Sequence, residues 1–74
     1  MNERLEAAAK LYDEAARELD QAARHCEVAA THFRNGEVPR GAAHAWAAVG
    51  HMREAEARLD EQAREHSRRS VPEA

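Results

Sequence analysis

A seven-residue repeat runs through the first half of the chain and limits the folds open to it. One row of the repeat carries large side chains and a cysteine, at Leu5, Tyr12, Leu19, Cys26 and Phe33. The neighbouring row carries alanine pairs, at Ala8-Ala9, Ala15-Ala16, Ala22-Ala23 and Ala29-Ala30. Four unbroken heptads of this kind are typical of a long helix, and the small alanines allow another helix to come unusually close.

The break in this pattern falls between Asn35 and Gly41. Asn35 and Gly36 tolerate the left-handed conformation that ends a helix, and Pro39 has the backbone angle of a first helical turn. We therefore expect a single domain over residues 1–67, made of a helix over 2–34, a turn over 35–40 and a helix over 41–67, and a frayed tail over 68–74. Gly50 is unfavourable inside the second helix, but one continuous helix is preferred to a break there.

The second helix has a thinner apolar arc than the first. It contains alanines together with Val49, Met52 and Leu59, and Glu56 falls inside it. A glutamate there requires an arginine or histidine partner, or a side chain that reaches past its neighbours to water. Trp46 lies at the margin of the arc, where it either covers the end of the intrachain core with Phe33 or anchors a contact between subunits.

Two helices joined by a short turn form an antiparallel helical hairpin, so the predicted fold class is all-α. A chain of 74 residues has little core, and alanine contributes little buried area to it. We expect two hairpins to pair into a homodimeric four-helix bundle, while higher oligomers and a different partner stay open. The predicted interface residues are Leu5, Ala8, Tyr12, Ala15, Leu19, Ala22, Cys26, Ala29, Phe33, Trp46, Val49, Met52 and Leu59.

Charge and cysteine content indicate the surroundings of the protein. The formal net charge is −3, which does not favour nucleic acid or an anionic membrane as the partner. The single cysteine excludes an intrachain disulfide and fits a reducing compartment. Neither a signal peptide nor a run long enough to span a bilayer is recognisable, so the expected location is the cytoplasm.

Four histidines form the main candidate for a metal-binding site in the sequence. His25 and His32 are seven apart on the first helix, and His44 and His51 are seven apart on the second. A hairpin centred near residue 38 places His32 level with His44 and His25 level with His51, as two rungs about 10.5 Å apart. The rungs either pack at the margin of the apolar arcs or bind zinc or another transition metal, with Glu54 as a further ligand.

Catalysis is not expected. Di-iron bundles require Glu-x-x-His pairs, and no glutamate precedes a histidine by three residues. Cys26 is not expected to be a catalytic nucleophile, because its neighbour His25 points about 100° away around the helix. It is predicted to be a buried packing residue because it lies in the row of large residues. The sequence therefore predicts a non-enzymatic interaction protein without a cofactor, which presents a helical face to a partner; the histidine-lined metal-binding bundle is the alternative.

The alternation of large residues and alanine in a short hairpin resembles the Rop proteins, which are homodimeric four-helix bundles that bind paired RNA loops. The resemblance covers the packing pattern over most of the chain, from the Leu5 heptad row to the helix after Pro39. It implies RNA binding as a second alternative function, and it assigns no role to any individual residue.

Overall fold

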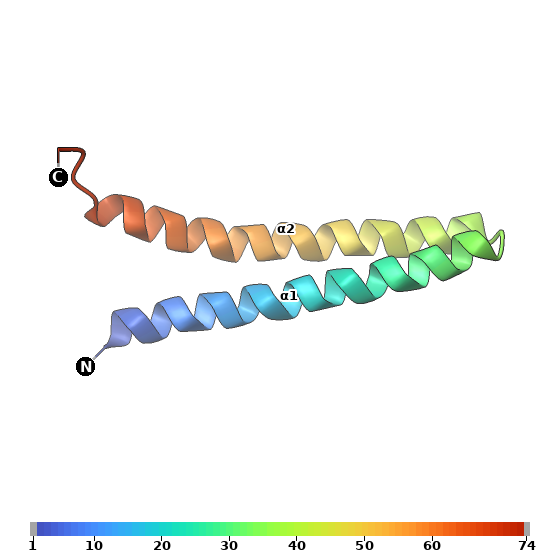
Figure 1. Ribbon diagram of the computed structural model, residues 1–74, viewed down its shortest axis with the longest axis horizontal. Coiled ribbons are helices and arrows are strands. Elements are labelled where there is room, and N and C mark those ends of the chain that lie inside the picture. The colour runs from blue at the N-terminus through green and yellow to red at the C-terminus, as the bar shows by residue number, and fades with distance from the viewer. Residues whose placement is uncertain (1, 74) are drawn as a thin grey trace.

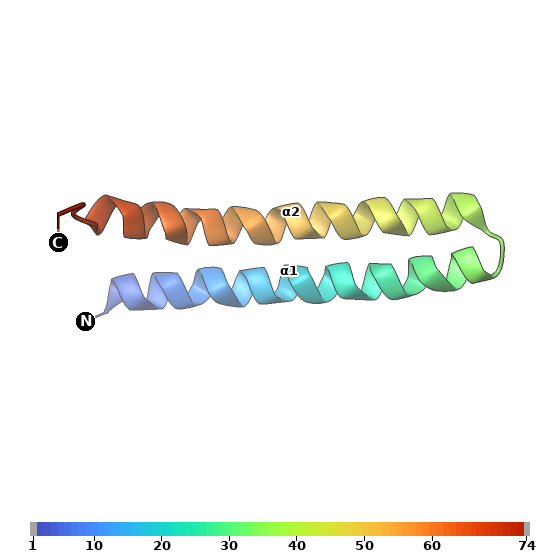
Figure 2. The ribbon, with the colours of Figure 1, turned by 45° about the horizontal axis from the view of Figure 1, so that its top comes forward.

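The computed structural model describes residues 2–73, and it consists of two long α-helices (Figure 1). Helix α1 spans Glu3–Arg34 and helix α2 spans Val38–Arg69, each with 32 residues. The helices run antiparallel, with both ends of the chain at the same end of the molecule (Figure 2), and no strand occurs within the described range. The predicted all-α helical hairpin is confirmed. Met1, the first residue of the predicted domain, and Ala74, the last residue of the predicted tail, lie outside the described residues.

The turn between the helices is held by two backbone hydrogen bonds. Gly36 has a positive φ of 75°, its N–H donates to the carbonyl of Phe33, and the N–H of Glu37 donates to the carbonyl of His32. This pair of bonds around a left-handed glycine is a Schellman motif, which satisfies carbonyls that the end of α1 would otherwise leave free. The chain therefore reverses its direction within three residues.

The helices differ slightly from the predicted ranges. Helix α2 begins at Val38, three residues before the expected start, and ends at Arg69, two residues after the expected end. Pro39 lies in its first turn, where a missing N–H leaves no bond unmade. The helix continues through Gly50 without a break, as preferred from the sequence. Asn2 occupies the cap position of α1, but its side chain makes no capping hydrogen bond.

The contact between the helices is made of very small residues. The buried positions are Ala15, Ala22 and Ala29 on α1, and Gly41, Ala48 and Ala55 on α2, again spaced by seven. The alanines among them are 2–6% exposed. An alanine Cβ built at Gly41 would lie 2.9 Å from the ring of Phe33, so glycine permits the ring to pack there. The first alanine of three of the four pairs in α1 therefore forms the intrachain seam.

The hairpin is long and thin. It measures 55 × 28 × 13 Å with a radius of gyration of 17.1 Å, whereas a compact chain of this length would have about 11 Å. Within residues 2–73 no large side chain is fully buried. The molecule is one layer of two helices, and one layer leaves a face of each helix open to solvent.

Neither α1 nor α2 has a stretch that is both apolar and long enough to cross a membrane. Both helices also carry charged residues, such as Asp13-Glu14 in α1 and Arg53-Glu54 in α2.

Candidate functional site: an apolar face and a histidine ladder

The hairpin has two different faces on either side of the alanine seam. On α1, His25 and Cys26 fall on opposite flanks of the buried alanine row, and on α2, His51 and Met52 do the same. Because His25 and His51 pack against each other, the histidine flanks share one face. The rows that contain Cys26 and Met52 therefore lie on the other.

The second of these faces is apolar and open. Most of its large side chains are about half exposed, from Val49 at 36% to Leu5 at 63%. We call this surface the apolar face; it consists of Leu5, Tyr12, Leu19, Cys26 and Phe33 from α1 and Val49, Met52 and Leu59 from α2. The second alanines of the pairs, such as Ala16 and Ala23, are exposed beside it. The large residues of the heptad repeat thus line this face, while the alanines close the hairpin.

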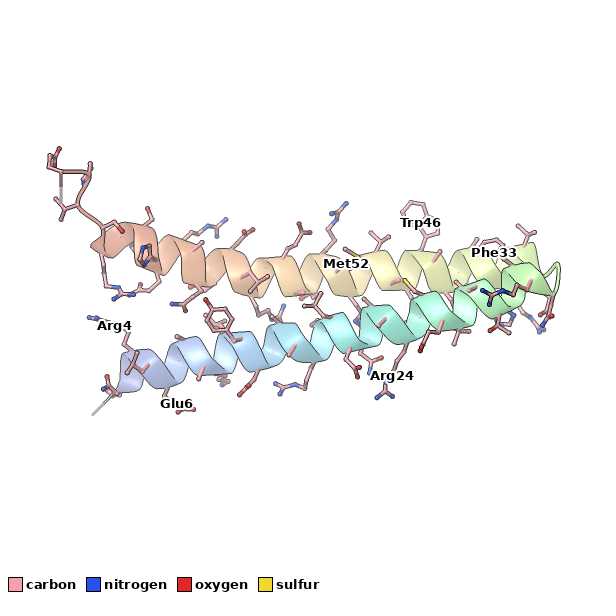
Figure 3. The ribbon with its side chains drawn as sticks, in the orientation of Figure 1. Arg4, Glu6, Arg24, Phe33, Trp46 and Met52 are labelled. Atoms are coloured by element: carbon pink, nitrogen blue, oxygen red, sulfur yellow. The ribbon has the colours of Figure 1, made fainter. Side chains whose placement is uncertain are left out.

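Two residues lie differently from the sequence-based expectation. Cys26 is exposed in the single hairpin, because its row borders the seam and does not enter it. Trp46 does not cover the core with Phe33: it is 74% exposed and points away from α1 (Figure 3). Its position on the outer side of α2 also separates it from the apolar face. Glu56 is exposed and forms an ion pair with Arg53 at 3.3 Å.

The opposite face is closed by polar side chains, of which four histidines form a continuous stack. The two predicted pairs are in contact, with ring centroids 5.4 Å apart for His32 and His44 and 5.3 Å apart for His25 and His51. The pairs are not separate, however, because His25 Nδ1 lies 3.0 Å from His44 Nδ1. We call His25, His32, His44 and His51 the histidine ladder. The order of contact is His32, His44, His25, His51, alternating between the helices.

A glutamate holds each end of the histidine ladder. His51 Nδ1 lies 2.7 Å from an oxygen of Glu18, and His32 Nδ1 lies 3.0 Å from an oxygen of Glu37. An ionised carboxylate only accepts hydrogen bonds, so both histidines donate from Nδ1 and, when neutral, carry their lone pair on Nε2. The central pair differs, because one Nδ1 must donate to the other. All four rings are partly buried between the helices.

Ion pairs extend the polar face beyond the ladder. Arg58 of α2 lies 3.5 Å from Glu14 of α1 and also donates a hydrogen bond to Glu54. The bond to Glu54, supported by the charges of Glu54, Glu14 and Glu18, raises the pKa of Arg58. Glu54 is therefore bonded to Arg58 and does not converge with two histidines on one point, contrary to its suggested role as a metal ligand.

Metal binding by three or more protein ligands has no preformed site here. Across residues 2–73, no three histidine, cysteine, aspartate or glutamate side chains converge on one point. Among the histidine pairs of the ladder, His25 and His44 bring two ring nitrogens, both Nδ1, to 3.0 Å from each other.

Three residues of these sites were not anticipated from the sequence. Glu18 lies seven residues before His25 in the same helical row, so the heptad spacing could have linked it to the ladder. Gly41 belongs to the row of Ala48 and Ala55, and the same spacing could have placed it in the seam. Glu37 reaches His32 only through the path of the turn, which no repeat encodes.

Comparison with known proteins identifies no relative of this chain. No family model matches the chain, and neither a curated protein nor a solved structure was found to be similar to it. The fold and its two faces define the chain as a two-helix hairpin with an alanine seam, an open apolar face and a polar face that carries stacked histidines.

Proposed function

We propose that the chain is a non-enzymatic interaction protein whose apolar face binds a second copy of itself to form a four-helix bundle. The observation that carries the proposal is the inversion of burial: the alanines are buried, while Leu5, Tyr12, Leu19 and Phe33 remain 46–63% exposed. Removing large apolar side chains from water is the main favourable term in association. In the single hairpin these side chains stay in water, so this favourable free energy is not gained.

The weakness of the single hairpin supports this proposal. Its core consists of five alanines and Gly41, and each buried methyl or methylene group contributes only about 0.8 kcal/mol. A chain of this size rarely gains more than about 3–5 kcal/mol from its own core. A second layer of helices packed on the apolar face would supply the missing burial, because side chains such as Leu19 and Met52 would then be enclosed.

The size of the face fits a stable dimer. The hairpin is 55 Å long, and two helices side by side are about 20 Å wide, so the face offers roughly 1,100 Å² of projected area. A stable interface buries about 800 Å² on each partner. A second copy has the same length and the same pattern, so a two-fold axis would match every heptad of one copy with a heptad of the other.

The alanine pairs support close contact on this side as well. In the two central pairs the first alanine, such as Ala22, is buried in the intrachain seam, and the second, such as Ala23, is exposed beside the apolar face. A second helix layer can therefore approach α1 closely without steric conflict. Few charges interrupt the face, and Glu56 at its edge is already paired with Arg53.

Sedimentation equilibrium over a range of concentrations tests the proposal. We expect a dimer at micromolar concentration for the natural chain, and a folded or partly unfolded monomer for Leu19→Glu, which places a charge at the centre of the apolar face. Val28→Glu is the matched control, since Val28 is on the same helix but off this face, and it should remain dimeric. A well-folded monomer of the natural chain at micromolar concentration would refute the proposal.

Labelling of Cys26 gives an independent measurement. Its thiol is exposed in the single hairpin and would be covered in the dimer. We expect the rate of alkylation to fall as the protein concentration rises, and to become independent of concentration in Leu19→Glu. Equal rates at all concentrations in the natural chain would place the contact between copies elsewhere.

A further inference from the structure

The centre of the histidine ladder has the geometry of a pair of metal ligands. His25 Nδ1 and His44 Nδ1 lie 3.0 Å apart and come from different helices. Two nitrogen ligands at about 2.1 Å from one ion are about 3.0 Å apart when they meet at a right angle, and about 3.4 Å apart in a tetrahedral arrangement. The observed separation matches the right-angle arrangement that Ni²⁺ and Cu²⁺ favour with nitrogen ligands.

We propose that His25 and His44 form an open binding site for a divalent transition metal that accepts nitrogen ligands at right angles, linking α1 to α2 on the polar face. Both rings would then bind through Nδ1 and carry their proton on Nε2. No third protein ligand converges on this point within the part of the chain that the structure describes, so water molecules complete the coordination of the ion. The site lies on the face opposite the proposed dimer contact and does not depend on dimerisation.

The outer histidines and the glutamates position the two ligands. The ring of His25 stacks on His51 at an interplanar angle of 14°, and that of His44 stacks on His32 at 19°. His51 is in turn bonded to Glu18, and His32 to Glu37. Each ligand ring therefore rests on a ring that a carboxylate orients.

This arrangement limits the reorganisation that binding requires. The ligand rings are partly buried and already face each other across the seam, so their side-chain freedom is largely lost before the ion arrives. The carboxylates of Glu18 and Glu37 also place negative charge near a cation without occupying its coordination positions.

Titration calorimetry with Ni²⁺, combined with thermal melting, tests the proposal. Ni²⁺ is the probe because the exposed thiol of Cys26 reduces Cu²⁺, and a Cys26→Ser background removes the thiol as a ligand. We expect one ion per chain, and a rise in melting temperature of about 10 °C or more when free Ni²⁺ is 100-fold above its Kd, since the ion ties the two helices together.

The matched control is His66, an exposed histidine of α2 outside the ladder. His25→Ala and His44→Ala should each lower the affinity at least about 10-fold and abolish the rise in melting temperature, and Glu18→Gln should weaken binding by a smaller factor. His66→Ala should change neither quantity. Circular dichroism of each variant without metal checks that the hairpin is still helical, and His25→Gln replaces His25→Ala if that variant is unfolded.

Two results would overturn the proposal. The first is an affinity that survives in both His25→Ala and His44→Ala but is lost in His66→Ala, which would assign binding to the exposed histidine. The second is binding without any rise in melting temperature, since an ion held by both helices must favour the folded hairpin.

Discussion

Replacing Ala22 by leucine tests whether the alanine seam holds the hairpin together. Ala22 is 5% exposed and lies midway along α1, where the two helices are in contact. Leucine adds three carbon atoms where the seam holds only alanine and glycine side chains, so the helices must move apart or the side chain must adopt a strained conformation. Overpacking of this kind costs about 1–3 kcal/mol. A core of this size stabilises the fold by only about 3–5 kcal/mol, so that loss is a large part of the total.

The matched control for this change is Ala57→Leu, at an exposed position of α2 away from both faces. Alanine and leucine have similar helix propensities, so propensity contributes little to either variant. Chemical denaturation followed by circular dichroism measures the free energy of unfolding. For Ala22→Leu it should be about 1–3 kcal/mol lower than for the natural chain, while for Ala57→Leu it should stay within about 0.5 kcal/mol of the natural value. Measurements at several concentrations separate this effect from dimer dissociation. Equal unfolding midpoints for the two variants would mean that Ala22 does not form a tight contact.

The glycines and the charged C-terminal turn give two further predictions. Gly50→Ala should stabilise the protein by about 0.5–1 kcal/mol in denaturant titration, because nothing lies within 4 Å of the new methyl group. Gly41→Ala should not stabilise it, because the ring of Phe33 occupies the space of the new methyl group. An equal gain in stability for both variants would contradict the structure. The hydrogen bond from Arg68 lowers the pKa of Glu65 below its ordinary 4.5, so the stability this carboxylate contributes is present above that value and is lost as the pH falls through the lower, folded-state pKa. Glu65→Gln should therefore reduce the pH dependence of the melting temperature between about pH 5 and about pH 3, and an unchanged slope would show that the bond is not formed in solution.

The sequence predicts the hairpin because its signals are local. The heptad row from Leu5 to Phe33 and the Asn35-Gly36 pair each depend on residues within one or two helical turns. Which row faces the partner helix is a different question. Hydrophobicity alone favours burying Leu19 before Ala22, but two helices without further layers come closest when alanine lies between them. The number of helices in the assembly decides the burial of Leu19, and that number is not a local property.

The histidine ladder shows how much depends on the register between the helices. Pairing His32 with His44 and His25 with His51 follows from a hairpin centred near residue 38, and both pairs are in contact. The turn is in fact complete by Glu37, which moves the centre toward Gly36 and slides α2 relative to α1. That shift brings His44 close enough to His25 for an Nδ1 to Nδ1 separation of 3.0 Å. A displacement of one or two residues in the turn thus converts two isolated histidine pairs into one connected ladder, and the proposed metal site exists only in the second arrangement.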